Sequence, residues 1–143
     1  MLEELDAKSK QVNERIEVVI RDHIQELEDA ALELVDAYWQ EWKDKKPRPS
    51  AGKVTPRFIK TPKYFRIVWE KRTMHFSGKG SYAEYIRKPK NANYNLGKLF
   101  GAAEGWEAPI IESYELRFAK IRDQLMFYQG ILGKIEKQQD SQA

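Results

Sequence analysis

Few side chains in this sequence could carry acid–base or metal chemistry. The only imidazoles are those of His23 and His75, and the chain contains no cysteine. A single histidine that is not grouped with other ligands does not make a metal site. We therefore expect His23 to be a packed residue on a helix, and His75 to contact phosphate or lie half-buried.

Two short motifs invite an interpretation as phosphate chemistry. Glu70-Lys71-Arg72 suggests the acid and lysine of a nuclease, but residues 45–69 contain no acid that could complete a metal pocket. Gly78-Lys79-Gly80-Ser81 lacks the spacing of a phosphate-binding loop. We therefore predict that the protein is not an enzyme and that it uses neither a metal nor a cofactor.

Charge is the strongest feature of the sequence. Residues 43–98 hold sixteen lysines and arginines against three acids, a net charge of +13. Residues 1–42 carry a net charge of −8 and residues 99–143 a net charge of −2. The overall charge of +3 therefore hides a dipolar molecule with one very positive segment.

Clustered lysines and arginines neutralise phosphates, and this makes binding strong and dependent on salt. The predicted DNA contacts on the strands are Arg57, Lys60, Lys63, Arg66, Lys71 and Arg72. The predicted phosphate contacts from loops are Lys79, Arg87, Lys88 and Lys90. Aromatic residues are interleaved with these cations; about half should be core, and exposed ones could stack on unpaired bases. The alternative is that the basic segment docks onto acidic helices of another copy or of a partner.

Residues 1–45 are predicted to form one long helix. Apolar residues recur at three- and four-residue steps from Leu5 to Trp42, and Pro47 follows as a stop. Such a helix would span roughly 60–65 Å, which is longer than a domain of this size can cover. Its apolar stripe should pack on a partner helix or a second copy, or else only on the chain's own C-terminal helix; both alternatives stay open.

The basic segment is predicted to contain strands. Residues 54–59 form a short strand that Pro56 restricts to a sheet edge. Residues 64–72 form the best strand, with Thr73–Phe76 either extending it or starting a third. Residues 82–87 fit a strand or a helical turn.

The C-terminal part is predicted to be helical. Asn95 is a plausible N-cap for a short turn ended by Gly101. The second long helix should begin around residues 106–109. The predicted fold is therefore α+β: a long N-terminal helix, a small basic antiparallel sheet of two or three strands, a short helix, and a long C-terminal helix packed against the first. We expect one domain, 1–143, divided into 1–45, 46–98, 99–137 and a tail, 138–143.

No stretch approaches the length of an apolar membrane span, and the polar, acidic N-terminus is unlike a signal peptide. Without cysteine there is no argument for an oxidising compartment. We therefore expect a cytoplasmic protein that does not associate with membranes.

The order of these features resembles a known family. It comprises an acidic helix ending in Tyr38-Trp39-Gln40-Glu41-Trp42, a basic strand closing on Trp69, a Gly/Lys loop, and Tyr94 ahead of Leu96 and Phe100. Trp106-Glu107 then opens a helix that carries Arg117 and Arg122. This pattern resembles the MobI-type conjugative mobilisation proteins, auxiliary factors encoded by some integrative conjugative elements and large plasmids. The resemblance implies a DNA-binding accessory protein of the relaxosome that acts at the origin of transfer alongside a relaxase. It assigns no functional residues.

The sequence therefore predicts duplex DNA binding without catalysis, most simply as a homodimer. Two alternatives are a helical protein–protein interaction adaptor and a single-stranded nucleic-acid or RNA-binding protein. The second alternative would be signalled by quenching of Trp69 fluorescence on unpaired oligonucleotides.

Overall fold

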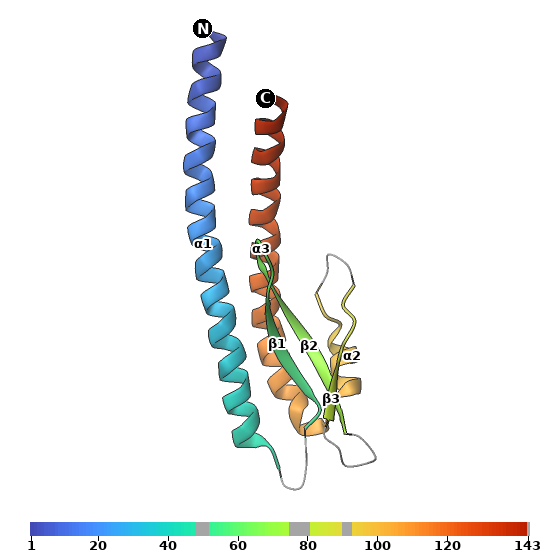
Figure 1. Ribbon diagram of the computed structural model, residues 1–143. Helices are drawn as coiled ribbons and strands as arrows, with labels where there is room; N and C mark the ends of the chain where they lie inside the picture. The colour runs from blue at the N-terminus through green and yellow to red at the C-terminus, as the bar shows by residue number, and fades with distance from the viewer. Residues whose placement is uncertain (48–51, 75–80, 90–92, 143) are drawn as a thin grey trace.

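The computed structural model describes residues 1–47, 52–74, 81–89 and 93–142. Two long helices, α1 (Leu2–Lys45) and α3 (Ala108–Gln142), form the framework of the fold. They pack against each other and run antiparallel, so that both chain ends lie at the same end of the pair (Figure 1). The predicted α+β architecture, with its two long helices, is confirmed.

The chain between these helices forms a three-stranded antiparallel sheet. Its strands are β1 (Val54–Lys60), β2 (Phe65–Met74) and β3 (Ser81–Tyr85), in the order β1-β2-β3. β1 is an edge strand, as Pro56 predicted, and its register runs from Val54 opposite Lys71 to Lys60 opposite Phe65. The two open alternatives are also resolved: β2 continues to Met74, and the segment after residue 80 is a strand, not a helical turn.

A short helix, α2 (Leu96–Ala102), and one 3-10 turn, η1 (Gly105–Glu107), lead into α3. Asn95 caps α2 as predicted, its side chain accepting a hydrogen bond from the Lys98 amide at 3.2 Å. The expected tail from residue 138 is wrong, because α3 continues to Gln142. Its last turns contain good helix formers, and Asn13 of α1 donates a hydrogen bond to Gln138 at 2.8 Å.

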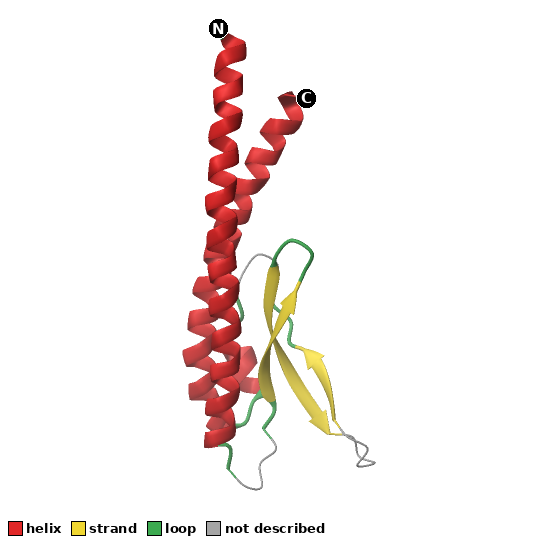
Figure 2. Cartoon of the chain, turned by 60° about the vertical axis from the view of Figure 1, so that its left-hand side comes forward, coloured by secondary structure: helices red, strands yellow, loops and turns green. Residues whose placement is uncertain are grey.

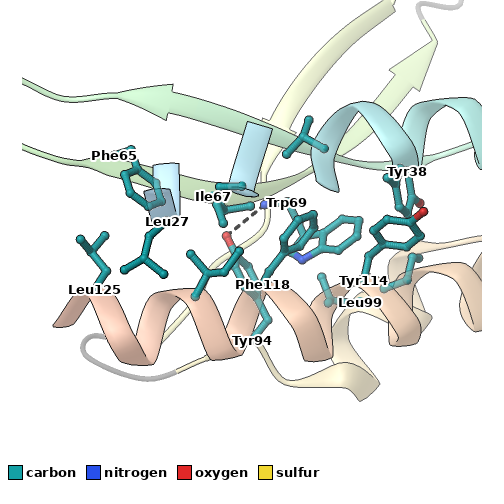
Figure 3. Close-up of a cluster of buried hydrophobic side chains, with 14 of the residues drawn as sticks. Leu27, Tyr38, Phe65, Ile67, Trp69, Tyr94, Leu99, Tyr114, Phe118 and Leu125 are labelled. Atoms are coloured by element: carbon teal, nitrogen blue, oxygen red, sulfur yellow. Dashed lines mark hydrogen bonds between the residues drawn. The ribbon is translucent and has the colours of Figure 1, made fainter. Parts of the chain in front are cut away.

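All the helices lie on one side of the sheet (Figure 2). The core fills the space between the helices and the sheet. Trp69 of β2 lies at its centre and is fully buried. The Trp69 ring meets those of Tyr38 and Phe118 at centroid distances of 5.2 and 5.7 Å. The Trp69 amide donates a hydrogen bond to the Tyr94 hydroxyl at 3.1 Å (Figure 3). Both long helices and the loop before α2 therefore contact β2 at Trp69.

The carboxylate of Glu107 is completely buried and joins three parts of the chain. It accepts hydrogen bonds from the Trp42 indole at 2.8 Å and from the Lys53 and Val54 amides at 2.9 and 3.0 Å. It also accepts one from the Glu104 amide at 3.0 Å, within a capping box. The end of α1, the start of β1 and the start of α3 are thereby held to one anion.

Next to this carboxylate, the backbone at Gly52 packs closely against the ring of Trp42. Gly52 is buried and has a φ of +69°, a conformation that favours glycine. A Cβ atom at this position would lie 2.1 Å from a ring carbon of Trp42. Both the backbone conformation and the contact with Trp42 therefore require glycine here.

Replacement of Glu107 by glutamine should destabilise the fold strongly. The amide nitrogen would face N–H donors and leave at least one of them buried without an acceptor, which costs about 2–4 kcal/mol. The measurement is the free energy of unfolding in urea. Glu112→Gln, an exposed change on the same helix, is the control and should stay within about 0.5 kcal/mol. Equal stability of the two variants would contradict the role given to Glu107.

Candidate nucleic-acid interface

The alternation of β2 gives its two faces different side chains, although Val68 and Glu70, on the same face as Arg66 and Arg72, are buried as well. Phe65, Ile67 and Trp69 are buried toward the helices. Since successive side chains point to opposite faces of a sheet, Arg66 and Arg72 belong to the face turned away from the helices, which we call the outer face. Both arginines are exposed. Arg57, paired in register with Val68, adds a third cation to this face.

Three of the predicted DNA contacts are engaged with acids of the same chain. Arg57 lies 3.2 Å from the carboxylate of Glu70, which is itself buried. Lys60 pairs with Glu28 of α1, and Lys63 lies 4.0 Å from Glu136 of α3. The three cationic side chains remain more than half exposed. The turn between β1 and β2 is therefore less positive than the sequence alone indicates.

Four other predicted contacts form no ion pair with any acid in the described ranges. Three of them lie within β2 (Arg66, Lys71 and Arg72), and Arg87 comes just after the end of β3. All four are exposed. The Arg72 guanidinium lies over the ring of Trp39 at 4.9 Å, a contact that orients the side chain and leaves its charge uncompensated. We call these four residues the free cations.

The remaining three predictions are Lys79, Lys88 and Lys90. Lys88 is half-buried and lines a cavity of about 500 Å³ beside β2. Burial, together with the nearby Arg122 and Arg66, lowers the pKa of Lys88 below its usual value. Lys79 and Lys90 lie outside the described residues, as does His75. His23 packs its ring edge-on against Tyr128, at 5.2 Å between centroids, as a structural residue does.

Arg122 of α3 is the important residue that the charge count missed, since it lies outside the basic segment. It donates to the Ile67 carbonyl through two nitrogens, at 3.1 and 3.2 Å, and to Glu115 at 2.8 Å. Its guanidinium stacks on Tyr94 at 5.0 Å. Glu115 and Arg122 occupy positions of the apolar stripe between Ile111, Phe118 and Leu125. Opposite charges seven residues apart on that stripe were the available signal.

Most aromatic residues of the basic segment are core, which limits base stacking. Trp69 is fully buried, and its indole donates to Glu115 at 2.9 Å. Trp69 therefore cannot report on bases at the surface, and the fluorescence test attached to it does not apply. Tyr85, at the end of β3, is 57% exposed and lies beside the cavity.

The nuclease interpretation finds no support in this geometry. Glu70 forms an ion pair with Arg57. Within the described ranges, no three His, Asp or Glu side chains gather closely enough to hold a metal ion. The described part of the chain also contains no helix with the length and apolar character needed to cross a membrane.

Replacement of Arg122 by lysine should loosen the region between α3 and the edge of β2. A single ammonium cannot serve Ile67, Glu115 and the Tyr94 ring together, so we expect a loss of about 1–3 kcal/mol in the free energy of unfolding. Arg117→Lys is the matched control, because Arg117 is an exposed arginine of α3 that also lies over a tyrosine ring. A loss no greater than that of the control would show that the Arg122 contacts contribute little.

A family model described as "MobI protein" matches residues 27–136, which is more than half of the chain. Comparisons with curated proteins and with solved structures give no match. The matched segment runs from α1 through the sheet into α3 and includes the outer face and the cavity. The resemblance found in the sequence is thereby confirmed. The chain belongs to the MobI family, whose members are accessory proteins of conjugative mobilisation and not a known enzyme family.

Proposed function

We propose that this protein binds duplex DNA at or near an origin of transfer, where it helps to recruit or assemble the relaxase complex. The observation that carries the proposal is the set of free cations. Arg66 and Arg72 lie on the outer face, whereas Lys71 is an exposed position of β2 with the opposite alternation and Arg87 is exposed just after β3. Membership of a mobilisation family supplies the biological setting. Phosphate is the partner that such uncompensated cations recognise.

The size of the surface fits a DNA backbone. Six residue steps separate Arg66 from Arg72, which corresponds to about 20 Å along a strand. That length covers roughly six phosphates of one DNA strand. Lys60 and Lys63, at the other end of the hairpin, are partly neutralised by α1 and α3. We therefore place the duplex along β2 from Arg66 to Arg72, and not over the β1–β2 turn itself.

The arrangement also keeps the acidic helices away from the DNA. The N-terminal 42 residues carry a net charge of −8, and the helices lie on the opposite side of the sheet from the outer face (Figure 2). A duplex on the outer face meets the cations first. The distant acids disfavour other orientations, so the charge distribution selects the approach as well as the partner.

The salt dependence of binding tests this proposal quantitatively. Four phosphate contacts predict a slope of log K against log salt of about −3.6, or roughly a 10²-fold loss between 50 and 200 mM salt. Arg66→Ala combined with Arg72→Ala should weaken binding several-fold and reduce the slope by about 2. The measurement is fluorescence anisotropy of a labelled duplex across a salt series.

The control for that experiment is Lys8→Ala combined with Lys10→Ala. Both lysines are exposed on α1, far from the sheet (Figure 1), so the slope should not change. A flat salt dependence in the wild-type protein, or equal effects of the two double variants, would contradict duplex binding by the outer face.

A specific observation favours a second role, that of pairing with another helix. On the first half of α1, Leu5, Val12, Ile16 and Val19 lie on one helical face and are 39–68% exposed. The N-terminal part of α1 extends beyond the end of α3 (Figure 1). An apolar face of this length fits the same face of a second copy. We propose that the DNA-binding form is a homodimer joined here.

Val19→Glu should therefore shift a dimer toward monomer, since it places a charge in the paired face. Val18→Glu is the matched control, because Val18 is also exposed but points about 100° away around the helix. Sedimentation equilibrium of the three proteins at micromolar concentration measures the outcome. A monomeric wild-type protein, or equal dissociation in both variants, would contradict pairing through this face.

A further inference from the structure

The cavity beside β2 shares Arg66 with the proposed duplex contacts, but its other lining residues have no part in duplex binding. The cavity lies beyond the end of β3, which pairs only with residues 70–74 of β2. From Phe65 to Val68, this edge of β2 is covered by the segment after β3 and by α3 instead of by a paired strand. Its volume of about 500 Å³ lies within the range of small-ligand sites. The volume therefore allows one small group to enter at this edge of β2.

The walls of this cavity divide into a cationic part and an apolar part. Arg66, Lys88 and Arg122 supply positive charge, whereas Tyr85, Leu125 and Met126 supply aromatic and apolar surface. Gln129 adds a half-buried amide that forms no hydrogen bond within the described ranges. A ligand that fits the cationic part, the apolar part and the Gln129 amide must have an anionic group, a flat apolar body and polar edges.

Among the residues that line the cavity, three are cationic and none is acidic. Glu115 is nearly buried and already engaged by Arg122 and by the Trp69 indole. Arg66 is left without an acidic partner among the described residues, and Lys88 is held in a place where its own charge is disfavoured. An arriving anion would stabilise the charged form of Lys88, which burial disfavours most and the nearby Arg122 and Arg66 disfavour further, and this is the arrangement expected of a phosphate site.

We propose that the cavity binds one unpaired nucleotide of the DNA, with its phosphate between Arg66 and Lys88 and its base against Tyr85. The Gln129 amide would then meet the polar edge of the base. Arg122 acts as a positioning residue, because its own donors hold β2, Glu115 and Tyr94. A base inside an intact duplex is stacked and cannot reach the cavity, so the site prefers DNA with an unpaired nucleotide. This inference rests on the proposed function and assigns the cavity a specific part in it.

The test compares three labelled oligonucleotide duplexes of the same sequence. One is fully paired, one carries a single bulged thymidine, and one carries an abasic bulge that keeps the phosphate but lacks the base. We expect the wild-type protein to bind the thymidine bulge roughly tenfold or more tightly than the other two, because base stacking on one aromatic ring is worth about that factor. Fluorescence anisotropy at constant salt gives the three affinities.

Variants of Tyr85 separate stacking from folding. Tyr85→Ala should lose the preference for the thymidine bulge, whereas Tyr85→Phe should keep it. Phe127→Ala is the matched control, since Phe127 is 64% exposed on α3 and outside the cavity, and it should also keep the preference. Circular dichroism confirms that each variant retains the wild-type helix content.

The outcomes distinguish the two proposals. Salt-dependent binding of all three duplexes with equal affinity overturns the nucleotide site and leaves duplex binding by the outer face intact. Equal affinity for the thymidine and abasic bulges also overturns it, because the cavity then recognises only phosphate or bent DNA. A bulge preference that survives Tyr85→Ala places the unpaired base elsewhere. Absence of binding to any duplex overturns both proposals.

Discussion

The hydrogen bonds of one buried carboxylate, that of Glu107, fix where the sheet begins relative to the helices. Its two oxygens collect the Trp42 indole, two backbone amides at the start of β1 and one amide ahead of α3. A sheet that slips by one residue exchanges its buried and exposed faces. By anchoring the start of β1 at Val54, Glu107 places this strand relative to the helices, with Arg57 on the outward-facing alternation.

A second buried carboxylate, that of Glu115, joins β2 to α3 through hydrogen bonds. It accepts a hydrogen bond from the Trp69 indole and pairs with Arg122, which in turn holds the Ile67 carbonyl and stacks on Tyr94. The free edge of β2 is thereby satisfied by side chains instead of by a further strand. This substitution leaves room for the cavity. The acids of the chain thus serve two purposes. The buried carboxylates hold the sheet in place, and the acids on the helices lie on the side of the sheet opposite the outer face.

The sequence was sufficient for those parts of the fold that depend on local patterns. Helical periodicity and Pro47 predicted α1, Pro56 predicted that β1 is an edge strand, and Asn95 predicted the cap of α2. The extent of α3 was underestimated because a contact from Asn13, more than a hundred residues away, supports its last turns. The candidate interface was predictable only as a charge excess. Which cations stay free depends on Glu28 and Glu136, whose proximity to Lys60 and Lys63 arises only in the folded chain.

We propose that the outer face of the sheet, and not the helices, meets the DNA. Amide chemical shifts of isotopically labelled protein, followed during titration with a duplex, test it most directly. The account predicts shifts concentrated at residues 66–72 and 83–88, with residues 2–19 of α1 changing only if the oligomeric state changes. Shifts confined to α1 and α3, with the outer strands unaffected, would contradict it.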